Sequence, residues 1–204
     1  MLPTTCSTVV RRVLGDFLAT DLQEFARTHP GRVRVAGNIP YNITTPILFH
    51  VLDNRHAVHD LTIMVQKEVG RRMAAGPDTG DYGILSVFCA YFTEVRAVFE
   101  VSRNVFFPKP DVTSLVMQLT MRQQPVYPAR DEQFFREMVR SVFGKRRKTL
   151  RNSLRYFTDP RGISLPPLPV LDRRPGELSL PELVNLSNAL HRCAPAQHAG
   201  PAGV

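Results

Sequence analysis

An asparagine, a proline and a tyrosine follow a segment of alternating apolar residues and could form a pocket for a planar base. The stretch reads Gly-Asn-Ile-Pro-Tyr over residues 37–41. Pro40 has no N–H and favours extended backbone at Ile39, so the local carbonyl groups can accept hydrogen bonds from a ligand. The amide of Asn38 adds another acceptor, and Tyr41 adds a flat ring. Two acceptors beside an aromatic ring suit a heterocycle with an exocyclic amine, such as adenine.

The chemistry of that amine explains why such a pocket would be useful. The amine of adenine is a poor nucleophile because its lone pair is delocalised into the ring. Acceptors that hold both N–H bonds favour a pyramidal nitrogen, whose lone pair can attack an electrophile without a strong base. A base must leave its stack to enter the pocket, and Phe106 or Phe107 could cover its other face. For residues 38–41 alone, a polar strand-to-helix turn without chemistry is the better explanation, because four residues match readily by chance.

The elements around this stretch alternate between strands and helices. The predicted strands are 8–14, 32–37 and 60–66, and the predicted helices are 20–29, 45–54 and 67–76. A helix running into a strand is predicted at 83–101, and a stiff proline loop followed by a strand at 106–122. Such alternation is typical of an α/β fold with a mostly parallel sheet. Ligands bind at the carboxyl ends of strands in these sheets, where residues 38–41 would lie.

The character of the sequence changes near Gln124. A helical pattern covers 131–157, a loop with five prolines follows, and a last helix is predicted at 179–192. The tail after this helix has low complexity and is expected to be disordered. We therefore expect an α/β domain over 1–124, a helical domain over 125–192 and a disordered tail over 193–204.

Positive charge dominates the start of the helical region. Between residues 136 and 155, Glu137 is the one acidic side chain among eight cations. A solvated face usually mixes both signs, so contact with phosphate groups is favoured over a merely solvated face. The residues expected to contact RNA are Arg140, Lys145, Arg146, Arg147, Lys148 and Arg151.

The composition restricts the class of protein. The chain has 204 residues and a net charge of +8, which favours a polyanionic partner but also fits a generally basic protein. No segment approaches the ~20 apolar residues of a membrane span, and the first residues lack the apolar core of a signal peptide. We therefore expect a cytoplasmic protein without a membrane partner. Three widely spaced cysteines argue against a disulfide framework or a zinc cluster, and we expect no metal.

Six segments resemble the ribosomal RNA adenine dimethyltransferases in type and order. They are "GDFL" (15–18), "VAGNIPYNITTPILFHVL" (35–52), "MVQKEVGRRM" (64–73), "DYGILSV" (81–87), "FFPKPDVTS" (106–114) and "FGKRRKTLRNSL" (143–154). This family dimethylates N6 of two adjacent adenines near the 3′ end of small-subunit ribosomal RNA. The resemblance implies a class I, Rossmann-like S-adenosylmethionine-dependent methyltransferase domain followed by a small helical RNA-binding domain.

The resemblance also implies roles for single residues. Asn38 and the Pro40 region would hold the target amine, while Tyr41 and Phe106 would sandwich the base. Asp16 would accept a hydrogen bond from the adenine amine of the S-adenosylmethionine cofactor, with Asn38 completing this part of the cofactor site. A helix cap is the alternative role for Asp16. The implied partner is small-subunit ribosomal RNA in an immature 30S particle, bound by a monomer.

Two features of the family are not found in the sequence. Its glycine-rich G-x-G-x-G turn is missing, since no two of the 12 glycines are separated by a single residue. The acidic residue that grips the cofactor ribose is also missing, so we expect an amino-terminally truncated domain that begins just before the family's third strand. A non-catalytic RNA-binding assembly factor therefore remains the main alternative, and a DNA adenine methyltransferase a weaker one. We also expect Tyr82 to face the substrate pocket.

Overall fold

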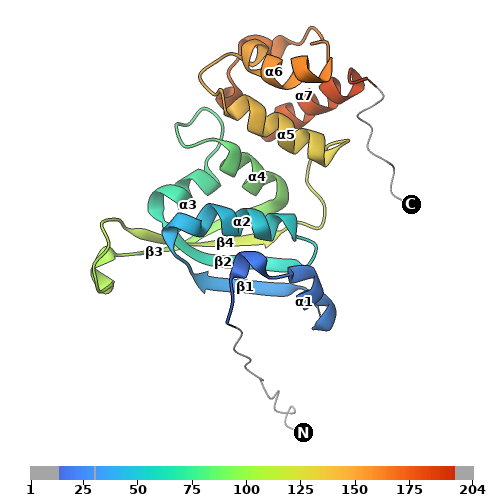
Figure 1. The fold of residues 1–204 in the computed structure, drawn as a ribbon. Coiled ribbons are helices and arrows are strands. Elements are labelled where there is room, and N and C mark those ends of the chain that lie inside the picture. Colours follow the sequence, from blue (N-terminus) through green and yellow to red (C-terminus); the bar gives the residue numbers. More distant parts are fainter. Residues whose placement is uncertain (1–13, 30, 196–204) are drawn as a thin grey trace.

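The computed structural model describes residues 14–29 and 31–195 of the chain (Figure 1). The strand predicted at 8–14 lies outside the described residues except for Leu14, which has no regular structure. Most of the predicted disordered tail, residues 196–204, also lies outside them. The description below covers the remainder, which includes all the candidate site residues.

A four-stranded sheet forms the centre of the first part of the molecule. Its strands are β1 (Val33–Asn38), β2 (Val58–Gln66), β3 (Thr93–Val101) and β4 (Ser114–Met121), in the order β1-β2-β4-β3. β1 and β2 are parallel, whereas β4 is antiparallel to both of its neighbours. The prediction of a mostly parallel sheet is therefore wrong for the described residues. β3 and β4 are joined without a crossover helix, and such a connection gives an antiparallel pair.

Helices cover the sheet and position its carboxyl edge. Short η1 (Phe17–Ala19) and α1 (Leu22–Thr28) precede β1, and η2 (Tyr41–Ile43) leads into α2 (Thr44–Asp53). α3 (Lys67–Ala74) and α4 (Ile84–Phe92) lie with α2 above the sheet in Figure 1. The structure confirms the helices predicted at 20–29, 45–54 and 67–76 to within a few residues.

β1 and β2 differ in how well they are covered. β2 buries Leu61, Ile63 and Val65, while the residues between them are half-buried. β1 has no buried residue, and its last three, Ala36–Asn38, are exposed. The described sheet therefore carries its polar turn at an accessible edge.

Three longer helices form the second part of the molecule. α5 (Glu132–Phe143), α6 (Leu150–Thr158) and α7 (Leu180–Arg192) pack together, with the turns η4 (Asp159–Arg161), η5 (Pro169–Asp172) and η6 (Pro175–Glu177) between the last two. The single helical pattern at 131–157 is thus two helices, interrupted by a turn that starts at Gly144. The helix predicted at 179–192 is confirmed, with Ser179 as its N-cap.

The two parts share one hydrophobic cluster, which runs from Leu22 to Leu190. An ion pair of 2.8 Å joins Arg55 to Glu132, and the Tyr91 hydroxyl accepts a hydrogen bond from the N–H of Ala129. These contacts seat α5 on α4. The boundary at 124/125 remains a prediction, because this continuous core does not mark a separate folding unit.

Candidate active site

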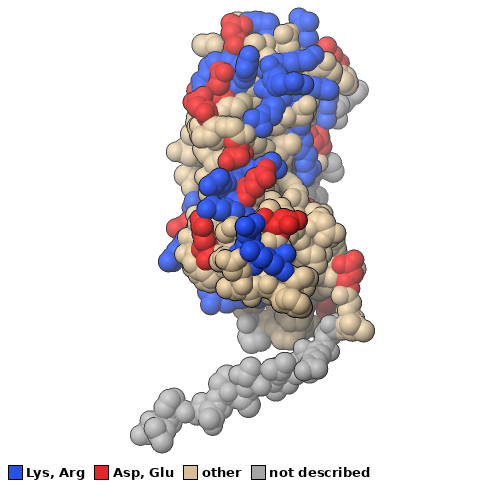
Figure 2. Space-filling view, turned by 90° about the vertical axis from the view of Figure 1, so that its left-hand side faces the viewer, with Lys and Arg blue, Asp and Glu red and all other residues tan. Residues whose placement is uncertain are grey.

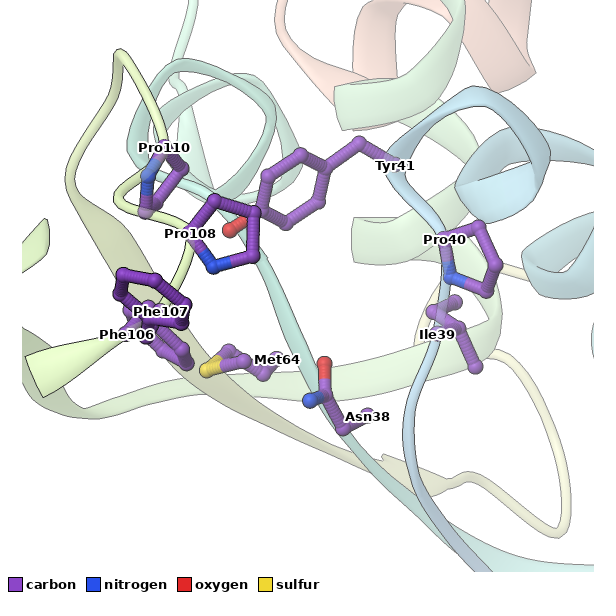
Figure 3. A pocket seen from close by; sticks show the side chains of 9 residues that line it. All are labelled: Asn38, Ile39, Pro40, Tyr41, Met64, Phe106, Phe107, Pro108 and Pro110. Atoms are coloured by element: carbon purple, nitrogen blue, oxygen red, sulfur yellow. The ribbon is translucent and has the colours of Figure 1, made fainter.

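A hollow of about 220 Å³ lies at the carboxyl edge of the sheet (Figure 3). It is lined by Asn38, Ile39, Pro40, Tyr41, Met64, Phe106, Phe107, Pro108 and Pro110. All four residues predicted to bind the target base are in this lining, although more than 60 residues of sequence separate Tyr41 from Phe106. The fold brings them together because β1 ends on the side where the loop between β3 and β4 turns back. This hollow is named the base pocket below.

The turn after β1 is shaped by Pro40. Its φ and ψ angles of −57° and 135° keep the chain extended after β1, and η2 starts at the next residue. Pro40 therefore ends the strand without a hydrogen-bond donor of its own. The exposed Asn38 side chain points into the hollow in Figure 3.

The ring of Tyr41 is fixed from the other side of the sheet. Its hydroxyl oxygen lies 2.6 Å from Oγ of Ser114, the fully buried first residue of β4. The sequence pattern did not reveal this contact. Its only trace there is that Ser114 closes the segment "FFPKPDVTS". The hydrogen bond holds the edge of the Tyr41 ring against the sheet and leaves the ring face toward the pocket.

The second aromatic wall comes from the loop between β3 and β4. After η3 (Arg103–Val105), Phe106 is half-buried and Phe107 is fully exposed at the rim. In Figure 3 both phenyl groups enter from the side opposite Asn38 and Pro40. The exposure of Phe107 distinguishes the two, since Phe106 is held by its neighbours and Phe107 is open to solvent.

The structure gives Asp16 a local role. This exposed residue is the N-cap of η1, and its Oδ1 accepts a hydrogen bond of 2.9 Å from the N–H of Leu18. The cap role considered from the sequence is thus present. A carboxylate has several acceptor positions on two oxygens, so the cap leaves Asp16 able to accept from a ligand. Asp16 does not line the base pocket.

The structure divides the predicted RNA-binding residues into two groups. Three have contacts within the protein: the Arg140 guanidinium lies 5.5 Å from the ring centroid of Phe49 and 5.6 Å from that of Phe88, Arg146 donates to the carbonyl of Gly80, and Arg151 pairs with Asp172. Lys145, Arg147 and Lys148 are exposed in the turn between α5 and α6. Residues 145–148 are four consecutive cations and are named the basic turn below.

The basic turn and the base pocket lie on the same side of the molecule. The carboxyl end of β1, the loop between β3 and β4 and the turn after α5 all lie toward the left of Figure 1. That side faces the viewer in Figure 2, where Lys and Arg side chains gather over the part formed by the last three helices. One polyanion could therefore contact both features.

One expected site residue is elsewhere. Tyr82 is 3% exposed and packs edge-on against Phe143, with ring centroids 5.7 Å apart. Burial, with a smaller contribution from the negative charge of Glu182, raises the pKa of Tyr82 to about 12. The prediction that Tyr82 faces the substrate pocket is wrong, because the residue belongs to the packing between the two parts.

The described residues offer no cluster of three His, Cys, Asp or Glu side chains able to hold a metal ion. None of the described helices is long and apolar enough to cross a membrane. The buried Cys89 has a pKa raised to about 12 by burial, which keeps its thiol protonated and makes it a poor nucleophile.

The fold and the turn after β1 define a Rossmann-like α/β domain of the methyltransferase class. Two solved structures share this fold. A dimethyladenosine transferase from Plasmodium falciparum aligns with a TM-score of 0.66 and 21% identity, over 84% of this chain and 69% of that one. The 23S rRNA methyltransferase ErmE aligns with a TM-score of 0.59 and 24% identity, over 88% of this chain and 71% of that one.

The sequence comparison is more specific. The model of the family described as ribosomal RNA adenine dimethylase matches residues 4–166, and the chain belongs to this family. Curated relatives named ribosomal RNA small subunit methyltransferase A include one from Chlorobaculum tepidum, 44% identical over 91% of this chain and 65% of the relative. Another from Moorella thermoacetica is 47% identical over 71% of this chain and 53% of the relative. The chain thus spans just over half to about two thirds of their length.

Proposed function

We propose that the protein transfers methyl groups from S-adenosylmethionine to N6 of two adjacent adenines near the 3′ end of small-subunit ribosomal RNA. The substrate would be the RNA of an immature 30S particle, so the reaction would belong to maturation of the small subunit. Membership of the adenine dimethylase family supports this proposal, and so do the names of the relatives. The observation that carries it is the base pocket.

The base pocket has the groups needed to hold an adenine that has left its stack. Tyr41 and Phe106 approach from different elements and could sandwich the ring, and each stacking contact contributes ~1–3 kcal/mol. The carbonyls beside Pro40 and the amide oxygen of Asn38 could accept the two N–H bonds of N6. A volume of about 220 Å³ is below the about 300–1,000 Å³ of drug-sized ligand sites, which fits a single base.

The reaction requires these residues to orient the amine and exclude competing nucleophiles. Acceptors on both N–H bonds favour a pyramidal N6, which acquires positive charge as the new C–N bond forms. The carbonyl dipole of Asn38 would stabilise that charge, and this stabilisation is greatest in the transition state. The proton leaves N6 afterwards, when the nitrogen is cationic and acidic.

The cofactor would supply a methyl group on a sulfonium, which is the electrophile. Among the described residues, Asp16 and Asn38 have the acceptor chemistry that suits it. The Asp16 carboxylate keeps an acceptor oxygen beside its cap bond and could accept from the cofactor's adenine amine. Asn38 stands at the carboxyl end of β1, where nucleotide ligands bind in open α/β sheets.

A labelled-methyl assay on immature 30S particles tests the proposal. We expect label in the RNA and a block to reverse transcription at two adjacent adenines, because dimethylated N6 cannot form a Watson–Crick pair. Asn38→Ala is the matched variant, since it removes the amide from an exposed position without disturbing the core. It should lose the label while retaining affinity for the particle.

The assay also separates the alternatives. Particle binding without methyl transfer would contradict the proposal and favour the non-catalytic assembly factor. Preferential labelling of duplex DNA in a competition would contradict the RNA substrate.

A further inference from the structure

The exposed face of α6 carries an aromatic ring between two cations. Tyr156 is 51% exposed. The ammonium nitrogen of Lys145 lies 5.1 Å from the ring centroid and that of Lys148 lies 5.2 Å from it. Lys148 also donates a hydrogen bond of 3.0 Å to the Tyr156 hydroxyl, so its charge sits nearer the hydroxyl than the ring centre. The ring therefore presents accessible π surface within a positive region.

A cleft of about 420 Å³ opens beside this ring. It is lined by Lys148, Asn152, Arg155, Tyr156, Asp159 and Pro160, and is named the Tyr156 cleft below. The lining residues recur at helical spacing, while Leu150, Leu154 and Phe157 on the other face of α6 are buried. The core thus holds the helix in place without using any side chain of the cleft.

The cleft mixes charges in a way that suits a nucleotide better than a bare phosphate. Lys148 and Arg155 are positive, and the hydrogen bond and charge of Lys148 lower the pKa of the Tyr156 hydroxyl. Asp159 adds a negative charge that would repel phosphate, and its Oδ1 accepts only a 3.3 Å bond from the Thr158 hydroxyl. A carboxylate and the Asn152 amide can instead accept from the exocyclic amine of a base. Phosphate, flat ring and amine occur together in a nucleotide.

We infer that the Tyr156 cleft binds one unpaired nucleotide of the RNA, with its base stacked on Tyr156 and its phosphate on Lys148 and Arg155. The inference rests on the proposed function, because that function brings RNA to the basic turn beside the cleft. The cleft is distinct from the base pocket, since none of its lining residues belongs to β1 or to the loop between β3 and β4. It would hold the RNA in register without taking part in methyl transfer.

Fluorescence gives a direct test, because the chain contains no tryptophan. A Tyr156→Trp variant carries one indole in the cleft, and stacking of a base should quench its emission. The probes are short single-stranded oligoadenylate and oligouridylate. Oligoadenylate should quench more, since uracil lacks the exocyclic amine that Asp159 would accept from. Tyr127→Trp is the control, because Tyr127 is similarly exposed, at 45%, and lies outside the cleft; its emission should not change.

Affinity measurements separate stacking from charge. Tyr156→Ala should weaken binding of oligoadenylate by about 5- to 150-fold, the range that corresponds to one stacked base. The slope of log affinity against log salt should stay the same, because no cation is removed. Tyr156→Phe keeps the ring and should bind nearly as the natural chain does. Lys148→Ala should instead reduce the slope by ~0.7, the value for one phosphate contact on a single strand.

The outcomes distinguish this inference from the proposed function. If the natural chain binds RNA and Tyr156→Ala binds it equally well, the cleft does not hold a base and only this inference is overturned. The same holds if both tryptophan variants are quenched alike. Equal quenching of Tyr156→Trp by the two oligonucleotides would overturn the role given to Asp159. If the natural chain binds neither the oligonucleotides nor immature 30S particles, the proposed function fails as well.

Discussion

The hydrogen bond between Tyr41 and Ser114 should matter more than a stacking role for Tyr41 suggests. Stacking needs the ring and not the hydroxyl, so the sequence predicts a mild effect for Tyr41→Phe. The structure places the hydroxyl oxygen 2.6 Å from Oγ of Ser114, which is fully buried. Removing the Tyr41 hydroxyl leaves a buried hydroxyl without this partner, which costs ~1–3 kcal/mol. We therefore expect Tyr41→Phe to lower the free energy of unfolding by about this amount and to weaken base capture.

A double-mutant cycle measures the contact. The free energy of unfolding is determined in urea for the natural chain, Tyr41→Phe, Ser114→Ala and the double variant. Replacing both partners by apolar groups can be nearly neutral, so the double variant should lose less stability than the sum of the single losses. A coupling free energy of at least ~0.5 kcal/mol is expected for residues in contact. Additive losses would show that the two hydroxyls do not interact, and the account of how the ring is held would be wrong.

Four further predictions concern the pocket, the charges and the packing. Asn38→Ala should reduce methyl transfer far more than RNA affinity, because the amide acts on charge that develops in the transition state; equal losses in the two assays would contradict this. Neutralising the basic turn should flatten the salt dependence of RNA binding by ~0.7–0.9 in log–log slope per phosphate contact, whereas Arg151→Gln, already paired with Asp172, should change it less. Folded Tyr82 holds its proton more tightly than the unfolded residue, so stability should be full below pH 10 and fall as the pH rises toward about 12, by about 2.7 kcal/mol; the same pH series on Tyr82→Phe should lack this fall. In calorimetric titration, residues 1–204 should bind S-adenosylmethionine weakly, because this sequence contains no G-x-G turn; micromolar binding would contradict that.

Local patterns were sufficient for most helices and for the parallel pair of strands. The apolar spacing at 45–54 and at 179–192 predicted α2 and α7, because burial of one helix face leaves a periodic trace in the sequence. The direction of β4 left no such trace, since an apolar strand reads alike in either orientation. The turn at Gly144 also escaped the pattern, because the apolar residues on both sides of it continue at helical spacing.

The base pocket was predictable in composition but not in how it is held. Asn38, Pro40 and Tyr41 are neighbours in the sequence, and their residue types already suggest a pocket for an amine-bearing ring. The hydrogen bond from Tyr41 to Ser114 depends on the register of β2 with β4, which pairs Gln66 with Ser114. Register is a property of paired strands, so no single segment contains it.

The sequence by itself determined the family, the net positive charge and the residue types that can hold an adenine. It could not say which cations are open to RNA, because Arg140 and Arg151 look no different in the sequence from Arg147. The tertiary structure decided this by placing Phe49 under Arg140 and Asp172 beside Arg151. It also buried Tyr82 and exposed Tyr156. Burial and pairing depend on segments that are distant along the chain and meet only when it folds, and for that reason the tertiary structure was needed to assign these residues.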